Sequence, residues 1–237
     1  MMHQTGLAIR RHATAQVFVD ILGDPELSPD DTHHLSRVRR VRDGEHIVVC
    51  DGAGAWQMWV WNSGTLDEAI GDIVVEPELT YTCVGVPLLA PGRTELAVEK
   101  LTELGVARIT PFVSERVQRP PKPDRAAVLL ERLHRIAREA AAQCRSVQLP
   151  VIDDVQQLGE LVGSRGDTLA FADPDGGPLT DAVNTLIVGP EGGFTDAEIG
   201  LAPTVWLSRH VLRAETAAIA AGVLLTAGLR GANEPNS

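Results

Sequence analysis

The segment from Leu186 to Ala218 constrains the fold of this chain more than any other part. An apolar strand, Leu186–Val188, runs directly into Gly189-Pro190-Glu191-Gly192-Gly193, and a second short strand, Val205–Leu207, runs into a polar loop and a helix of small residues. In open α/β sheets, loops at the carboxyl ends of strands meet in one crevice that binds ligands. Because glycines let backbone groups approach a ligand closely, we expect a cofactor site built mainly from backbone.

The glycine-rich loop lacks two better-known ligand signatures. It has neither the Lys-Ser/Thr ending of a phosphate-binding loop nor the G-x-G-x-x-G spacing of a dinucleotide fingerprint. The plain alternative is a Gly-Pro turn between a strand and a helix. Thr195-Asp196-Ala197-Glu198 has the form of a capping box, which predicts a helix start there. Glu191 and Glu198 are then also explained as acids that the helix dipole favours.

Length and composition fit a globular enzyme. The chain has 237 residues, 44% of them hydrophobic, which is enough for one large domain or two modest ones. It has no signal-peptide pattern and no apolar run long enough to cross a bilayer, so we expect a cytoplasmic protein without membrane association. The three cysteines, Cys50, Cys83 and Cys144, are widely spaced, which favours reduced, buried side chains and predicts no metal site.

The distribution of charge matters more than its sum. The net charge is −11, yet eight Lys or Arg residues against three acids lie between Arg116 and Arg145, and four more arginines crowd into residues 37–42. A locally basic face can hold RNA phosphates while the rest of the surface stays acidic. The alternative is a solvated helix face with pairs such as Glu131–Arg135. The two basic clusters together favour an RNA partner.

The pattern of short strands and turns predicts a small β-rich domain over residues 1–76. Its β-prone runs are 17–19, 47–49, 56–61 and 70–75, with turns at Asp51-Gly52 and Asn62-Ser63-Gly64. In the run 56–61, Trp56, Met58 and Val60 are expected in the core, and Trp59 and Trp61 face the other way.

Strands and helices alternate over residues 77–237, which predicts an α/β domain with a mainly parallel sheet. Helices are expected over Thr94–Leu104, from Asp124 to about Cys144, and over Arg213–Leu229. Strands are expected at 82–86, from Ile109 with an interruption at Pro111, and at 168–172, 186–188 and 205–207.

Five sequence blocks occur in the order of a known family. They are GPEGGFTDAEI with LSRHVLRAETAA; Glu99–Val106 with Ile109-Thr110-Pro111 and Ser114-Glu115-Arg116; Ala140–Cys144; His33-His34-Leu35 with Val38–Glu45; and Asp51–Gly54. Together they resemble the ribosomal RNA small subunit methyltransferase E family, of the SPOUT class. The resemblance implies a trefoil-knotted methyltransferase domain, preceded by a PUA-like RNA-binding β-barrel. It also implies a homodimer with each site near the interface.

The activity implied by the resemblance is methyl transfer from S-adenosylmethionine to N3 of a uridine near the 3′ end of 16S ribosomal RNA, in the 30S subunit. The methyl donor is already activated as a sulfonium, so the protein must hold the two reactants in position and make the uridine nitrogen nucleophilic. No metal is expected. Arg213 is the first choice for stabilising the anion formed when N3 loses its proton. Its alternative role is a helix-start arginine or a phosphate contact. Glu191 and Glu215 are the candidate proton acceptors.

The resemblance and the two basic clusters together point to binding residues. The expected cofactor contacts are Ile187, Gly189, Pro190, Glu191, Gly192, Leu207, Ser208, Val211, Leu212 and Thr216. The expected RNA contacts are Arg37, Arg39, Arg40, Arg116, Gln143 and Arg145.

The chain departs from the family pattern at a few positions near these contacts. They are Ala90, Ser146, Gln148 and Ser208–His210. Two other classes of protein remain open: a noncatalytic RNA-binding or ribosome-assembly protein on the same fold, and a nucleotide-dependent enzyme that uses the glycine-rich loop.

Overall fold

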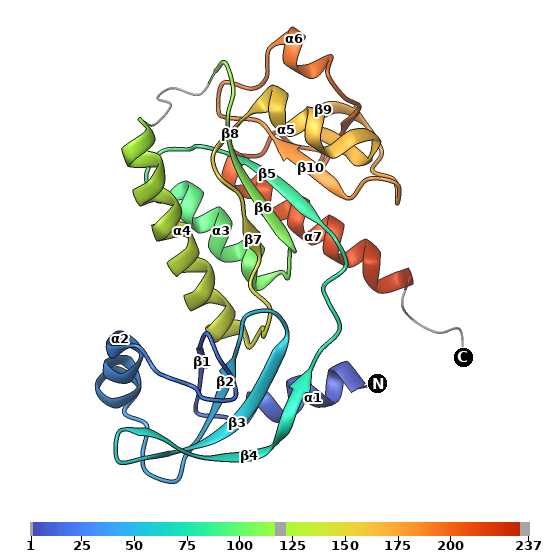
Figure 1. Ribbon diagram of the computed structural model, residues 1–237. Helices are drawn as coiled ribbons and strands as arrows, with labels where there is room; N and C mark the ends of the chain where they lie inside the picture. The colour runs from blue at the N-terminus through green and yellow to red at the C-terminus, as the bar shows by residue number, and fades with distance from the viewer. Residues whose placement is uncertain (1, 117–121, 233–237) are drawn as a thin grey trace. The chain divides into compact units, whose positions relative to one another are not determined.

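The computed structural model describes residues 2–116 and 122–232 (Figure 1). The chain forms two compact units. The first unit comprises Met1–Glu78 and Arg138–Leu149, and the second comprises Leu79–Ala137 and Pro150–Ser237. A segment from the middle of the chain thus belongs with the N-terminal unit. The division into 1–76 and 77–237 stays a prediction.

The first unit is built on a four-stranded sheet, in the order β1-β2-β3-β4. Its strands are β1 (Ala15–Phe18), β2 (His46–Cys50), β3 (Ala55–Asn62) and β4 (Thr65–Val75). β1 and β2 are parallel, and the other neighbours are antiparallel. Ser63 and Gly64, both with positive φ, join β3 to β4, which confirms the expected turn and matches the twist of a two-residue hairpin.

Strand β3 is buried on both faces. Trp56 and Met58 pack with Phe18 on one side, and Trp61, only 2% exposed, packs with Ile47 on the other, where Trp59 is partly buried. This alternation confirms that Trp59 and Trp61 face away from Trp56. This unit also has helical segments that were not predicted from the sequence: α1 (Met2–Arg11), α2 (Pro29–His33) and the π-helix η1 (His34–Arg39).

The second unit holds a larger sheet, in the order β11-β9-β10-β5-β6-β7, with β8 also paired to β6. All pairings between its described strands are parallel, which confirms the expected α/β class. The strands are β5 (Cys83–Pro87), β6 (Arg108–Val113), β7 (Val151–Ile152), β8 (Gln156–Gln157), β9 (Leu169–Gly177), β10 (Thr185–Val188) and β11 (Thr204–Val205). The helical segments are α3 (Arg93–Glu103), α4 (Pro123–Cys144), α5 (Leu158–Arg165), η2 (Gly166–Thr168), α6 (Asp196–Ile199) and α7 (Ala214–Ala232).

The two faces of this sheet carry separate apolar clusters. Leu186 and Val188 of β10 pack with α3, α4 and α7, which lie on one face. Ile187, between them, packs with Leu161 of α5 and Phe171 of β9 on the opposite face (Figure 1). Such alternation is the period of a strand that is covered on both sides. It fixes which side chains of β10 can reach a ligand.

The expected interruption of the strand at Pro111 is wrong, because β6 runs unbroken from Arg108 to Val113. On one side of β6, two short strands take the place of one continuous neighbouring strand. β7 pairs with Arg108 and Ile109, β8 pairs with Phe112 and Val113, and Pro111 lies opposite the gap between them. A proline is tolerated there because no ladder hydrogen bond needs its missing N–H.

The cysteines have the expected environment. Cys50 and Cys83 are fully buried, and Cys144 is partly buried. Burial raises the pKa of the Cys50 and Cys83 thiols above the ordinary value, so both stay protonated and act as small apolar groups. Within the described residues, no cluster of three metal-ligating side chains occurs. None of the helices described there has the length and apolar character of a membrane crossing.

We expect Gly222→Ala to lower the free energy of unfolding by about 1 kcal/mol. Gly222 lies where α7 packs on α3, and a Cβ atom there would stand 2.6 Å from Leu101 Cδ2 in the core. The matched control is Gly163→Ala in α5, where nothing lies within 4 Å of the added atom and helix propensity alone should stabilise. Urea unfolding of both variants measures the difference. Equal stabilisation by the two alanines would contradict tight packing at the α3–α7 contact.

Candidate active site

A cavity of about 460 Å³ lies in the second unit, at the carboxyl end of β10 and beside the residues of β9 that follow its pairing with β10. Four segments line it: the middle of β9, the end of β10 with the glycine-rich loop that follows, the loop between β11 and α7, and the first turn of α7. This is the crevice expected where strand-end loops meet at the carboxyl edge of a parallel sheet, here the loops after β10 and β11, which flank β9. The lining residues are Ala172, Asp173, Pro174, Val188, Gly189, Pro190, Glu191, Gly193, Phe194, Leu207, Ser208, His210, Val211, Leu212, Arg213, Ala214 and Ala217.

The glycine-rich loop has a close-packed shape that its sequence dictates. A Cβ atom on Gly189 would stand 3.1 Å from the ring of Phe194, which in turn packs on Phe171 with 4.7 Å between ring centroids. Thr195 caps α6 through the expected capping box, with Glu198 accepting from the Thr195 backbone N–H at 2.8 Å. The loop therefore returns on itself and presents its backbone to the cavity.

Arg116 holds this loop in place. Its Nη1 atom donates to the carbonyl oxygens of Gly192 at 2.9 Å and Phe194 at 3.0 Å. Glu198 also accepts from the backbone N–H of Glu115 at 2.9 Å. The Ser-Glu-Arg motif thus joins the end of β6 to the cavity wall, and its arginine supports the loop.

Seven of the ten expected cofactor contacts line the cavity: Gly189, Pro190, Glu191, Leu207, Ser208, Val211 and Leu212. The other three do not. Ile187 is fully buried on the opposite face of the sheet. Gly192 packs against Arg116, and Thr216 is exposed on α7.

The contribution of β9 to the cavity wall was not predicted from the sequence. Ala172, Asp173 and Pro174 line the cavity because β9 is the neighbour of β10 in the sheet. The signal was present, since a polar Asp-Pro-Asp run directly follows the expected strand 168–172. Phe194, His210 and Ala217 also line the cavity and were not assigned.

The three candidate catalytic residues, Arg213, Glu191 and Glu215, have different surroundings. Arg213 lines the cavity, and in the described part of the chain no carboxylate lies within ion-pair distance of it. Glu191 lines the cavity and accepts a hydrogen bond from Arg93 Nη1 at 2.9 Å. Glu215 is 91% buried and does not line the cavity; its Oε1 atom lies 3.9 Å from Arg93 Nε. The guanidinium of Arg213 is therefore the cation available to a ligand here.

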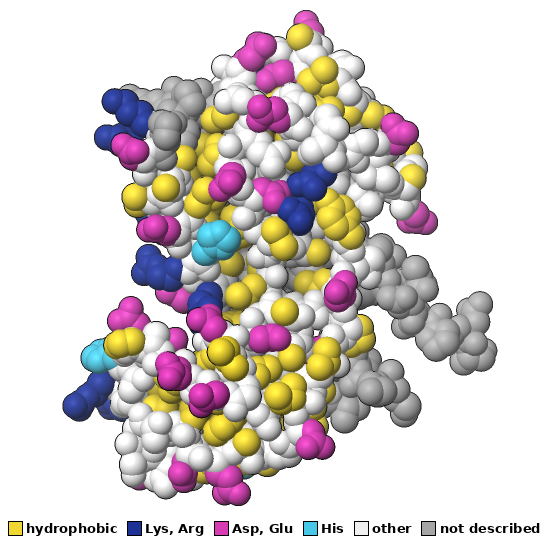
Figure 2. Space-filling model, viewed as in Figure 1, with side chains coloured by type: hydrophobic (Ala, Val, Ile, Leu, Met, Phe, Trp, Pro, Cys, Tyr) yellow, Lys and Arg dark blue, Asp and Glu magenta, His cyan; other side chains and the backbone are white. Residues whose placement is uncertain are grey.

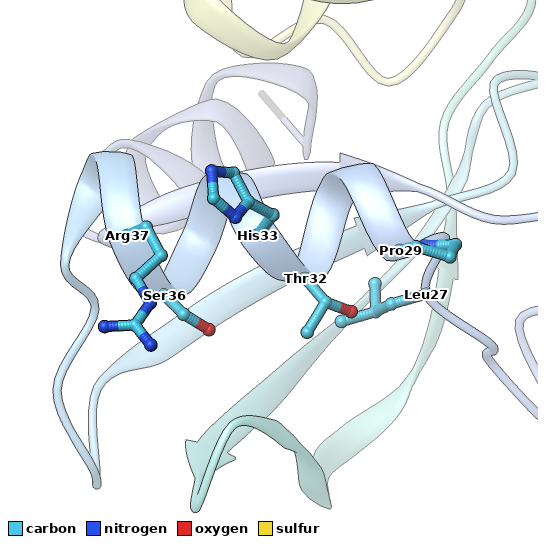
Figure 3. A pocket seen from close by; sticks show the side chains of 6 residues that line it. All are labelled: Leu27, Pro29, Thr32, His33, Ser36 and Arg37. Carbon is cyan, nitrogen blue, oxygen red and sulfur yellow. The ribbon is translucent and has the colours of Figure 1, made fainter.

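A second, wider depression of about 660 Å³ lies on α2 and η1 of the first unit (Figure 3). It is lined by Leu27, Pro29, Thr32, His33, Ser36 and Arg37. Thr32, Ser36 and the guanidinium of Arg37 extend below the helical segment in the view of Figure 3. Of the expected RNA contacts, Arg37 thus borders a surface with several hydrogen-bond donors.

The remaining expected RNA contacts have mixed environments. Arg40 ends η1 in a left-handed conformation, and Gln143 is exposed on α4. Arg39 lies near the carbonyl oxygen of Thr14, at 3.4 Å. Arg145 is directed inward: its Nη2 atom donates to the carbonyl oxygen of Ala13 at 2.8 Å, and burial lowers its pKa. On the face shown in Figure 2, acidic side chains are scattered while Lys and Arg gather in a few places.

The chain matches two families of known domains. Residues 76–226 match the RNA methyltransferase domain, and residues 27–57 match the RNA methyltransferase PUA domain. It is 31% identical over 216 residues to the ribosomal RNA small subunit methyltransferase E of Synechocystis, covering 81% of this chain and 69% of that protein. It is 26% identical to the Bacillus subtilis enzyme of the same name, covering 81% and 85% of the two chains.

Solved structures show the same fold. A methyltransferase from Legionella pneumophila, solved in complex with the bound cofactor SAM, superposes with a TM-score of 0.78 at 27% identity, covering 90% of this chain and 97% of that one. The ribosomal RNA small subunit methyltransferase E of Neisseria gonorrhoeae, bound to S-adenosyl methionine, gives 0.73 at 24% identity, with 90% and 97% covered.

Proposed function

The chain belongs to the ribosomal RNA small subunit methyltransferase E family, and we propose that it transfers a methyl group from S-adenosylmethionine to N3 of a uridine near the 3′ end of 16S ribosomal RNA. One observation carries the proposal for the site: seven expected cofactor contacts, from two loops that are apart in sequence, line one cavity. Such a protein works in the cytoplasm, where ribosomal RNA is modified.

The cavity suits the cofactor in size and character. Its volume of about 460 Å³ lies within the range of small-molecule sites, and most of its lining is apolar or backbone, with a few polar groups. Leu207, Val211 and Leu212 offer apolar walls for an adenine ring. The backbone of Gly189 and Pro190 can contact the ribose, because Gly189 has no side chain to hold a ligand away.

Bound S-adenosylmethionine would supply a methyl group on an electrophilic sulfonium. The chain must then make uridine N3 a nucleophile, which requires loss of the proton that N3 carries. In this proposal Arg213, which lines the cavity, donates to O2 or O4 of the uracil and so stabilises the N3 anion. Because Glu191 and Glu215 both face Arg93, we propose that the proton leaves to solvent.

Methyl transfer to 30S subunits and to naked 16S RNA, with the product nucleoside identified, tests the activity. A ribose methyl or a guanosine methyl as product would refute the proposed substrate. Calorimetry with S-adenosylmethionine separates the enzyme from a noncatalytic RNA-binding protein. No heat of binding with correctly folded protein would favour the latter.

The proposal includes a homodimer. Val211 is 83% exposed beside the cavity, and Trp206, Val223 and Leu224 are exposed apolar side chains of the same loop and of α7. Apolar side chains exposed in one region are typical of a protein–protein interface. A second copy that covers them would place each site near the interface, as in the family. The mass of the protein in solution, measured by light scattering, tests this.

We propose that the depression on α2 and η1 contacts the RNA backbone through Arg37. Replacing Arg37 with alanine should weaken RNA binding and lower the slope of log K against log salt by about one, because one fewer phosphate is neutralised. Binding titrations over a range of salt concentrations measure the slope. Lys100→Ala is the charge-matched control, since Lys100 pairs with Glu99 and Glu103 on α3. An unchanged slope for the Arg37 variant would place the RNA elsewhere.

A further inference from the structure

Arg93 lies within ion-pair distance of two acidic groups of the site, one on the glycine-rich loop and one at the start of α7. It is the first residue of α3, and its guanidinium meets Glu191 of the glycine-rich loop at 2.9 Å. On its other side, Nε lies 3.9 Å from Oε1 of Glu215, in the first turn of α7. Arg93 itself does not line the cavity.

The start of α3 is held firmly, so the position of Arg93 is defined. Gly92, with φ of 88°, forms the N-cap, and its backbone N–H donates to Glu95 at 2.8 Å. Thr94 accepts from the backbone N–H of Leu89 at 3.0 Å. Glu95 is also paired with Arg132 of α4 at 3.1 Å. These contacts place one cation between two carboxylates that approach it from different segments.

The need for this cation follows from the burial of Glu215. Its side chain is only 12% exposed, and in the described part of the chain its Oε2 atom has no hydrogen-bond partner. A buried carboxylate without a nearby cation is costly, so it attracts whatever cation can reach it. Arg213 stands only two residues earlier in the same segment, and Glu191 shares the cavity wall with it. Either carboxylate could therefore draw Arg213 away from a ligand.

We propose that Arg93 is a positioning residue: it binds Glu191 and Glu215, and thereby leaves the guanidinium of Arg213 free to act on the uracil. The inference rests on the proposed methyl transfer. It gives the two glutamates a part in charge balance in place of proton transfer. A guanidinium paired with a carboxylate would stabilise a second anion much less, because its charge and donors are already engaged.

The test compares steady-state methyl transfer by Arg93→Ala, Arg93→Lys, Glu191→Gln and the double variant Arg93→Ala/Glu191→Gln. We expect Arg93→Ala to lower kcat about tenfold, less than loss of the acting donor itself, with little change in the KM for RNA. Its pH–rate profile should move to higher pH, because the N3 anion is less stabilised. Arg93→Lys should keep most of the activity. Glu191 lines the cofactor cavity, so Glu191→Gln is measured by itself at saturating S-adenosylmethionine, and relative to that single variant the double variant should lose much less than the tenfold that Arg93→Ala loses in the unchanged protein.

Other outcomes would overturn the inference. They are an Arg93→Ala variant no slower than the control Lys100→Ala, and a double variant that, relative to Glu191→Gln alone, loses as much as Arg93→Ala loses in the unchanged protein. A defect confined to the KM for RNA, with a smaller salt slope, would make Arg93 a phosphate contact instead. Thermal unfolding of each variant shows whether the fold is kept. If the unchanged protein itself transferred no methyl group, the proposed function would fail, which is a result distinct from all of these.

Discussion

Replacing Arg213 with glutamine should lower kcat for methyl transfer by about 10²- to 10³-fold, the usual cost of removing a donor that stabilises a developing anion. Arg213 lines the cavity and, within the described residues, has no carboxylate partner. The substitution leaves its backbone carbonyl free to accept from the N–H of Ala217, which it does at 2.8 Å, so α7 should still begin normally. S-adenosylmethionine should bind nearly as before. Single-turnover assays and calorimetry measure the two quantities separately.

A matched control and a pH series sharpen this prediction. Arg209→Gln removes an exposed arginine from the same loop that does not line the cavity, and it should change kcat little. Arg213→Lys keeps the charge and should be intermediate. The activity that remains in Arg213→Gln should rise at higher pH, where uridine N3 ionises without help. An Arg213→Gln variant that lost only RNA affinity would show that Arg213 binds a phosphate.

Replacing Ala217 with phenylalanine should raise the Kd for S-adenosylmethionine by about 100-fold or more, equal to at least about 2.7 kcal/mol. Ala217 lines the cavity from α7 and is only partly buried, so a ring added there enters the space of about 460 Å³ that the cofactor needs. Methyl transfer should fall in parallel at a fixed cofactor concentration. Calorimetry gives the affinity.

Ala217→Ser is the size-matched control, and its affinity should stay within a few-fold of the unchanged protein. Circular dichroism and thermal unfolding establish that the phenylalanine variant is folded. A folded Ala217→Phe protein with normal affinity would place the cofactor outside this cavity, and would leave the membership in the family untouched.

The sequence predicted those parts of the site that are local. Thr195 and Glu198 form their capping box, Ser63 and Gly64 form their turn, and the glycine-rich loop lines the cavity. Each of these depends on residues a few positions apart, where backbone conformation and short hydrogen bonds decide the outcome. The contribution of the two strand-end loops to one cavity was also predictable, because both loops follow apolar strands of one sheet.

What the sequence did not predict depends on neighbours that are distant in the chain. Ile187 belongs to an apolar strand covered on both faces, and hydrophobicity cannot tell which face borders the cavity. Asp173 reaches the cavity only because β9 pairs with β10. The resemblance gave Arg116 only as an RNA contact, and its two hydrogen bonds to carbonyl oxygens of the glycine-rich loop were not predicted.

The position of Pro111 has a consequence for the alignment of the sheet. β6 pairs with Ile152 of β7 through Ile109 and with Gln157 of β8 through Val113. If β6 slipped by two residues in either direction, Pro111 would take the place of one of these paired residues. The neighbouring strand would then face a nitrogen that has no hydrogen to donate, and a buried acceptor would lose its partner. Pro111 thus restricts β6 to one register against β7 and β8, and the Ser-Glu-Arg motif follows directly after this strand.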